Sequence, residues 1–255
     1  MPGTLPTLGR TRPARHTLEA LSVPLDVRFV LLRPRVPENL GAAARALKNF
    51  GWEDWGTVHS EVSDPAAARR MAVQAEDTLE ARKRWASLDE AVADRAWVVG
   101  TSSRKVPGRR RLTPRELAEE ARRRGPTALV FGDERSGLTN EELERCHALS
   151  ALPTTAAQPS VNLAQAVLLY AYELRELALS EGDGSTGPRP VPASDAQLQV
   201  LRGALVGTLR RGGFLKDAGR PAPELLLATL VRSGLSRAEV ELWTAALKTV
   251  EKHLP

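Results

Sequence analysis

Two polar segments of this sequence, each followed by a helical pattern, hold residues whose types and spacing could do chemistry. The first covers residues 37–51, where Asn39 is the predicted cap of a helix and Gly51 ends it. Residues 41–44 are glycine and alanine, and Arg45 follows them. A guanidinium above such a bare helix start can hold a phosphate or a carboxylate through two hydrogen bonds. The alternative is an ordinary solvated arginine on a helix face.

The second segment is the loop of residues 152–162, which precedes the most apolar helical pattern in the chain. Ser160 and Asn162 form the predicted helix start, where unpaired backbone N–H groups point into the loop. Apolar side chains surround the opening turns, so this helix must be covered on more than one side, by its own domain or by a second copy of the chain. Taken alone, the segment is better explained as a core helix with an ordinary cap.

Composition narrows the possible classes of protein. A chain of 255 residues with 42% hydrophobic content can bury one sizeable core and a small second domain. Its apolar runs fall far short of the roughly 20 residues that a membrane span requires. The single cysteine, Cys146, excludes a disulfide framework and a Cys-based zinc cluster within one chain, which favours a reducing cytoplasm and no metal. A net charge of +5 and a pI near 9.8 favour a polyanionic partner such as nucleic acid.

Apolar strand patterns alternate with capped helical patterns between residues 27 and 177. Strands are predicted at residues 27–32, 55–60, 96–103 and 127–131. Helix starts are predicted at Asp64, Ser87, Thr113 and Thr139, the last three with a capping-box pattern. This alternation predicts a parallel α/β sheet with helices on both faces, whose strand carboxyl ends face a ligand crevice. The pattern Gly-x-Gly-x-x-Gly is absent, which disfavours a dinucleotide site.

A basic segment follows the third strand. Its cations are a candidate track for RNA phosphates, or else a solvated face. The segment contains no acid, and its basic residues are Arg104, Lys105, Arg109, Arg110 and Arg111.

Composition also divides the chain into regions. We expect a disordered basic tail at residues 1–24, an α/β domain at 25–179, a linker at 180–193 and a small all-α C-terminal extension at 194–255. The extension has helical patterns at residues 194–211, 221–233 and 236–253.

Four motifs in order, PENLGAAARALKNFG, VVGTSSR, LVFGDERSGLTNEEL and LPTTAAQPSVNLAQAVLLYAYEL, resemble those of the SPOUT class of RNA 2′-O-methyltransferases, TrmH branch. The helical tail is similar to the C-terminal extension of the TrmJ subgroup, which methylates the pyrimidine at tRNA position 32. The resemblance implies a SPOUT-type parallel sheet with a C-terminal trefoil knot, a homodimer, and S-adenosyl-L-methionine as cofactor. One departure is the stretch MAVQAED, residues 71–77, where the family often has a small, glycine-containing loop.

The resemblance also assigns roles to residues. Those implied in catalysis are Asn39, Arg45, Glu134, Ser160 and Asn162. Those implied around the cofactor are Thr101, Ser102, Gly132, Leu152, Ser160 and Leu163. Arg45 is expected to contact RNA together with the basic segment. A guanidinium does not readily lose its proton, so we expect Arg45 to anchor a phosphate and stabilise the developing alkoxide rather than to act as the base.

These observations predict methylation of a ribose 2′-hydroxyl in RNA, in the anticodon loop of tRNA at position 32, by a cytoplasmic enzyme. Two alternatives stay open at this point. One is a ribosomal RNA 2′-O-methyltransferase of the same fold, and the other is a knotted RNA-binding module that has lost catalysis. Retention of Arg45, Glu134, Ser160 and Asn162 argues against the second.

Overall fold

A single parallel sheet organises the computed structural model, which describes residues 25–104, 106–179, 191–215, 225–226, 228–230 and 234–254. The predicted tail at 1–24, most of the predicted linker, and Lys105 lie outside these residues. The sheet has seven strands in the order β3-β2-β1-β6-β4-β7-β5, and every pair of neighbours is parallel. The strands are β1 Val27–Leu32, β2 Trp55–Val58, β3 Lys83–Trp85, β4 Trp97–Thr101, β5 Arg111–Leu112, β6 Thr127–Phe131 and β7 Ala148–Ser150.

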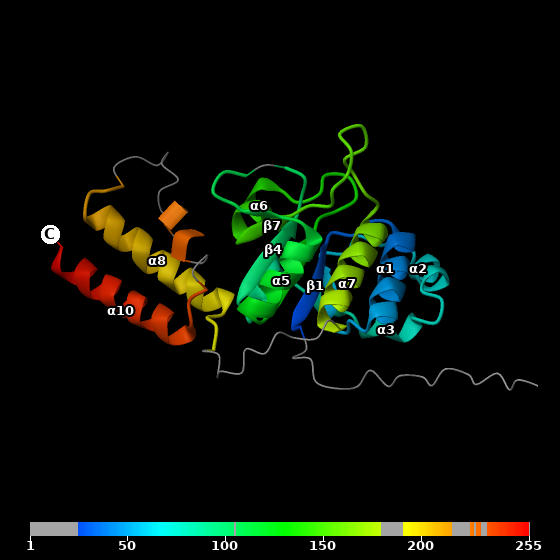
Figure 1. Ribbon diagram of the computed structural model, residues 1–255, viewed down its shortest axis with the longest axis horizontal. Coiled ribbons are helices and arrows are strands. Elements are labelled where there is room, and N and C mark those ends of the chain that lie inside the picture. The colour runs from blue at the N-terminus through cyan, green and yellow to red at the C-terminus, as the bar shows by residue number, and fades with distance from the viewer. Residues whose placement is uncertain are drawn as a thin grey trace, which may run out of the picture.

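Helices cover both faces of this sheet (Figure 1). They are α1 Pro37–Phe50, α2 Pro65–Met71, α3 Glu76–Ala81, α4 Leu88–Val92, α5 Pro114–Arg124, α6 Asn140–Arg145 and α7 Leu163–Leu179. Alternate residues of β1 face opposite cores: Phe29 and Leu31 pack with α1, α5 and α7, whereas Val30 and Leu32 pack on the side of α4 and α6. The predicted α/β class, with its parallel sheet and two helical layers, is therefore confirmed.

Several predicted element ends agree with the structure. The strands at residues 27–32 and 127–131 have the predicted bounds, and Asp64, Thr113 and Thr139 cap their helices as expected. The predicted strands at 55–60 and 96–103 are shorter, at Trp55–Val58 and Trp97–Thr101. The sequence did not predict β3, β5 and β7, which have two or three residues each and leave no clear periodicity. Arg111 accordingly begins β5 instead of lying in a loop.

The prediction that Asn39 caps α1 is wrong. The cap residue is Val36, three positions before Asn39, and the helix begins at Pro37 because proline fits the first helical position. Asn39 thus lies within the first turn, and its side chain is free to bond elsewhere. The small residues let α1 pack closely against its neighbour: a Cβ on Gly41 would lie 1.9 Å from the carbonyl oxygen of Ala68 on α2.

Helix α7 begins at Leu163, so the predicted start at residues 160–162 is slightly early. Asn162 caps it, since its Oδ1 accepts from the backbone N–H groups of Ala164 (2.9 Å) and Gln165 (3.2 Å). One side of α7 is buried against α1 and α5. The other leaves four large side chains about two-fifths exposed: Leu168 (39%), Leu169 (43%), Tyr172 (43%) and Leu179 (39%).

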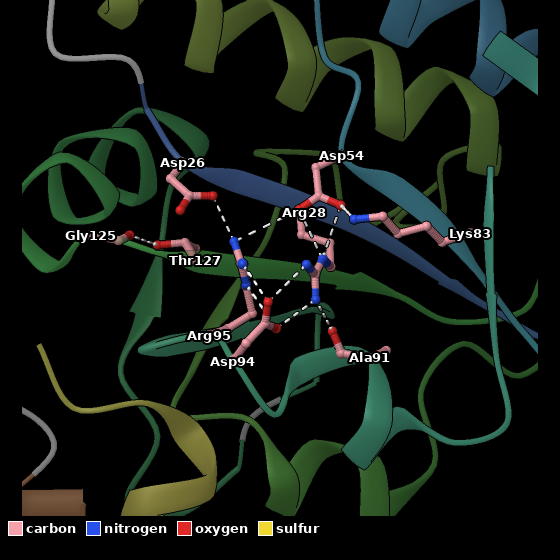
Figure 2. A network of polar contacts seen from close by, with 9 residues as sticks. All are labelled: Asp26, Arg28, Asp54, Lys83, Ala91, Asp94, Arg95, Gly125 and Thr127. Atoms are coloured by element: carbon pink, nitrogen blue, oxygen red, sulfur yellow. Dashed lines mark hydrogen bonds and ion pairs between the residues drawn. The ribbon is translucent and has the colours of Figure 1, made fainter. Parts of the chain in front are cut away.

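A network of charges closes the sheet at the amino ends of its strands (Figure 2). Arg28 on β1 binds Asp94 through two nitrogens (2.7 and 3.1 Å) and Asp54 through Nε (3.0 Å). Arg95 binds Asp94 (2.7 Å) and Asp26 (2.6 Å). Paired charges therefore hold the amino ends of the strands together. The carboxyl ends of the strands, at the opposite edge, are available for a binding site.

The C-terminal extension contains α8 Asp195–Arg211 and α10 Arg237–His253, which lie side by side at the end of the molecule opposite α2 and α3 (Figure 1). The predicted middle helix, at 221–233, falls mostly outside the described residues. Asp195 joins the extension to the sheet domain: its backbone N–H donates to Arg95 O (2.5 Å), and its carboxylate binds Arg145 at the end of α6. Within the described ranges, no helix combines the length and apolarity that crossing a bilayer requires.

Candidate active site at the carboxyl ends of the strands

A cleft of about 680 Å³ opens where the loops after β1, β4, β6 and β7 meet. Parallel strands bring these loops together although they are far apart in the sequence. Every residue that the resemblance implies around the cofactor lines this cleft, namely Thr101, Ser102, Gly132, Leu152, Ser160 and Leu163. Asn39, Glu134, Asn162 and Arg104 line it as well. The structure therefore brings together residues from all four motifs.

Three polar side chains form a hydrogen-bonded series across the cleft. The Glu134 carboxylate accepts from the backbone N–H groups of Arg35 (3.0 Å) and Val36 (3.1 Å) and from Asn39 Nδ2 (3.0 Å). Asn39 Oδ1 in turn accepts from Asn162 Nδ2 (2.8 Å). Because Asn162 also caps α7, the series joins the β6 loop, the first turn of α1 and the start of α7. Each amide orientation is fixed by the bonds of its neighbours.

The loop after β6 is held in a tight turn. A Cβ on Gly132 would lie 2.0 Å from the backbone of Gly137, so only glycine fits at this position. Asp133 accepts from the backbone N–H groups of Arg135 and Ser136, both at 2.8 Å, and from the Ser136 hydroxyl at 2.7 Å. Burial opposes ionisation of Asp133, but these hydrogen bonds and the nearby Arg33 outweigh it and lower its pKa. The loop thus carries a fixed negative charge under the cleft.

Arg33 is a cleft-supporting residue that the sequence analysis missed. It follows β1 with a left-handed φ of 48°, which is uncommon for a residue other than glycine. Its guanidinium forms an ion pair with Glu142 of α6, lies 3.6 Å from Asp133 and donates to Gly137 O at 3.5 Å. The bond to Glu142 raises the pKa of Arg33. No sequence pattern links Arg33 to Glu142, because only the fold places them side by side.

The floor of the cleft is closed by a buried hydroxyl pair. Tyr170 on α7 donates to Ser150 Oγ (2.9 Å), and Ser150 donates to Leu112 O (3.0 Å). Burial raises the pKa of Tyr170 to about 12, so its hydroxyl stays protonated as a hydrogen-bond donor. Ser102 N donates to Ser150 O (2.9 Å), which ties the β4 loop to the same floor. These bonds hold the hydroxyl-rich wall in place.

The residues predicted to contact RNA differ in their exposure and in their hydrogen-bond and ion-pair partners. Arg45 is exposed on α1 and does not line the cleft of its own chain. Arg104 donates to Asn140 (3.0 Å), Arg109 donates to the backbone oxygen of Glu144, and Arg110 is paired with Glu120 (3.0 Å). Among the described residues Arg111 has no ion-pair or hydrogen-bond partner. Several cations of this segment thus already contact other groups of the protein.

No group of three or more His, Cys, Asp or Glu side chains is arranged to hold a metal ion in the part of the chain that the structure describes. Cys146 is buried beneath β4, and burial raises the pKa of its thiol to about 12. It is a packing residue here.

The sheet and its cleft define an α/β protein that binds its ligand at the carboxyl ends of parallel strands. The chain belongs to the SpoU rRNA Methylase family, whose family model matches residues 26–172.

Relatives named for one activity are similar over most of the chain. The tRNA (cytidine/uridine-2′-O-)-methyltransferase TrmJ of Salmonella typhimurium is 38% identical over 203 residues, which are 75% of this chain and 82% of that protein. The protein of the same name from Pectobacterium atrosepticum is 35% identical over 241 residues, 89% of this chain and 97% of the relative. The crystal structure of TrmJ from Z. mobilis has a TM-score of 0.73 at 29% identity and covers 88% of this chain and 98% of its own.

Proposed function

We propose that the protein transfers a methyl group from S-adenosyl-L-methionine to a ribose 2′-hydroxyl of tRNA, at position 32 of the anticodon loop. The observation that carries this proposal is the series Glu134, Asn39 and Asn162, in which residues of separate motifs converge on one cleft. Similarity to proteins named tRNA (cytidine/uridine-2′-O-)-methyltransferase supports the choice of RNA. We place this activity in the cytoplasm.

The cleft fits the cofactor in size and chemistry. Its volume of about 680 Å³ lies within the range of small-molecule sites, about 300–1,000 Å³. Hydroxyl groups of Thr101 and Ser102 and the backbone around Gly132 and Leu152 offer hydrogen bonds to a nucleoside and an amino acid, and Leu163 offers an apolar contact. When bound, the cofactor would supply a methyl group on a sulfonium, for an in-line displacement that needs no metal and leaves a thioether. The proton of the ribose hydroxyl would pass to solvent.

The protein's part is to orient the ribose and to stabilise the charge that develops on its oxygen. Asn39 is fixed on both sides by Glu134 and Asn162, so it is a preorganised amide at the mouth of the cleft. Ser160, which also lines the cleft, adds a hydroxyl. The permanent charge of Arg45 suits it to hold the phosphate next to the ribose and to stabilise the alkoxide.

We infer that Arg45 contributes to the cleft of a second copy of the chain and not to the cleft of its own chain. It lies on the exposed face of α1, away from the cleft that its own chain forms. Exposed apolar side chains on the neighbouring α7 offer a surface for that copy, and Tyr172 packs edge-on against Phe50 of α1 at 5.9 Å. The proposed homodimer covers this patch and places Arg45 at the site of the partner.

The SPOUT-type trefoil knot and the division into domains at residues 25–179 and 194–255 are part of the same proposal. The interleaved strand order β6-β4-β7-β5 supports the knot, because the connections β4 to β5 and β6 to β7 must cross. The separate core of Ala193, Leu198, Leu201 and Val240 supports the extension as a distinct unit.

The deciding experiment is methylation of synthetic anticodon stem-loops by the purified protein. We expect transfer to a stem-loop with a ribose at position 32 and none to the same stem-loop with a 2′-deoxyribose there, with mass mapping to locate the methyl group. Transfer to ribosomal RNA fragments but not to tRNA would favour the ribosomal alternative. Cofactor binding without transfer to either RNA would favour a module without catalysis.

A further inference from the structure

A second cavity, of about 180 Å³, lies beside β3 at the edge of the sheet opposite β5. It is formed between α1, α2, α3 and β3, and the cleft described above shares none of its residues. Its apolar lining comes from Leu40, Val62, Pro65, Ala68 and Leu79. Its charged lining comes from Arg69, Glu80, Arg82 and Arg84. A small apolar hollow thus has three guanidinium groups and one carboxylate around it.

The single carboxylate of the cavity lining already has an ion-pair partner. Glu80 binds Arg69 at 2.8 Å, and both side chains are more than half exposed. Arg84 has no ion-pair or hydrogen-bond partner among the described residues, and Arg82 has no ion-pair partner among them. The lining therefore has an excess of positive charge that no acid of the described chain compensates.

Arg82 is also incompletely satisfied. One terminal nitrogen, Nη1, donates to Leu79 O at 2.6 Å, but Nε is buried and has no hydrogen-bond partner. Burial lowers the pKa of Arg82, and the charge of Arg84 lowers it further. A buried donor without an acceptor is unfavourable, and two cations that line one cavity repel each other. An oxyanion in the cavity would offset that repulsion.

We propose that this cavity binds a phosphate group, with Arg82 and Arg84 as its ligands. The planar guanidinium fork matches two phosphate oxygens, and the bond to Leu79 O restrains Arg82 in advance. The cavity is large enough for a phosphate group but not for a whole nucleotide. The group can come from the backbone of a bound RNA or from a free phosphate compound.

The arginine side-chain N–H signals of the full-length protein offer a direct test by NMR. Titration with inorganic phosphate, at ionic strength held constant with chloride, should shift the Nε–H signal of Arg82. Arg84→Gln should weaken this binding by about tenfold, as loss of one charged hydrogen-bonding group does. Arg84 is exposed, so this variant should fold normally.

The matched control is Arg70→Gln. Arg70 is an exposed arginine on α2 that does not line the cavity, and its nearest acid, Asp64, is 4.0 Å away. Its replacement removes the same charge and should leave phosphate binding unchanged. If phosphate does not move the Arg82 signal, or if Arg70→Gln and Arg84→Gln weaken binding equally, the cavity is not a phosphate site.

A second titration with tRNA separates the two sources. If the Arg82 signal shifts with tRNA and phosphate competes, the ligand is a backbone phosphate, and the RNA footprint extends to the β3 edge. If only inorganic phosphate shifts it, the ligand is a free phosphate compound. Both titrations measure binding and need no methyl transfer. The phosphate site can therefore be disproved without disproving the proposed methyltransferase activity, and the activity can be disproved without disproving the phosphate site.

Discussion

Asn162 donates its side-chain amide to Asn39 Oδ1 across 2.8 Å, although 123 residues separate the two in the chain. The same Asn162 side chain uses its oxygen to cap α7, and the amide of Asn39 is held by Glu134. A single asparagine therefore fixes a helix start and orients a cleft residue at once. These two roles can be separated by mutation.

Replacing Asn162 with aspartate or with alanine should give different losses. Asn162→Asp keeps an oxygen to cap α7 but cannot donate to Asn39, and Asn39 cannot turn its amide over because Glu134 needs the donor. We expect near-normal thermal stability and a loss of methyl transfer. Asn162→Ala should lose the same activity and, in addition, about 1 kcal/mol of stability from the missing cap. Equal activity in the aspartate variant and the wild type would contradict the positioning role.

Arg45→Ala should retain cofactor affinity, measured by calorimetry, and lose about a hundredfold or more in methyl transfer, as loss of one transition-state contact can do. Lys48→Ala is the control, since it removes an exposed cation from the same helix. Mixing Arg45→Ala protein with Asn39→Ala protein, under conditions that exchange subunits, should restore activity, because each mixed dimer holds one intact composite site. Activity that stays low after exchange would place Arg45 in the cleft of its own chain.

Arg33→Gly tests whether Arg33 holds the β6 loop in place. The change relieves the left-handed backbone, by about 1 kcal/mol, but loses charged hydrogen bonds of about 1.5–3 kcal/mol. We therefore expect a modest fall in the unfolding free energy and weaker cofactor binding, because the loop at Gly132 is no longer held. Arg35→Ala, which removes a partly buried arginine two residues on that is paired with Glu61, should not weaken cofactor binding. A cofactor affinity that is unchanged in Arg33→Gly would rule out this support.

The basic segment should contribute to RNA binding unequally. Arg111 has no partner among the described residues, whereas Arg110 is paired with Glu120 at 3.0 Å. Arg111→Ala should reduce the slope of log affinity against log salt by about 1, and Arg110→Ala should reduce it less. Arg115→Ala on α5, where Arg115 is paired with Glu119, is the control. If Arg109, Arg110 and Arg111 can all be replaced without a change in slope, the RNA track lies elsewhere, and the helical extension is the next place to look.

Acid should destabilise the fold through the network at the amino ends of the strands. Burial opposes ionisation of Asp94, but Arg95 and Arg28 outweigh it and hold its pKa well below the ordinary value of 3.8. As pH falls below 3.8 the unfolded chain binds the proton first, so the stability due to Asp94 is present above that pH and is lost below it. Asp94→Asn should cost about 1 kcal/mol at pH 7, since water screens this half-exposed group, and should flatten the loss of stability below pH 3.8 in urea unfolding. Glu119→Gln should leave the profile unchanged.

Much of the architecture could be predicted from the sequence, because local patterns decide it. Strand β1 and strand β6 are mostly apolar, and the caps at Asp64, Thr113 and Thr139 depend on residues within three positions of each other. The short strands β3, β5 and β7 could not be predicted, since two or three residues become a strand only by pairing with a neighbour already in the sheet.

The membership of the cleft follows from the motifs, but the bonds within it depend on the tertiary structure. No local sequence pattern predicts that Asn39 bonds to Glu134 and Asn162 instead of capping a helix. No such pattern predicts that Arg33 pairs with Glu142 either. These contacts exist because parallel strands align their carboxyl ends, which brings loops more than ninety positions apart within hydrogen-bond distance. Sequence alone thus determined which residue types are present for the chemistry, whereas the three-dimensional fold decided which of them touch, because hydrogen bonds depend on distances in space and not on separation along the chain.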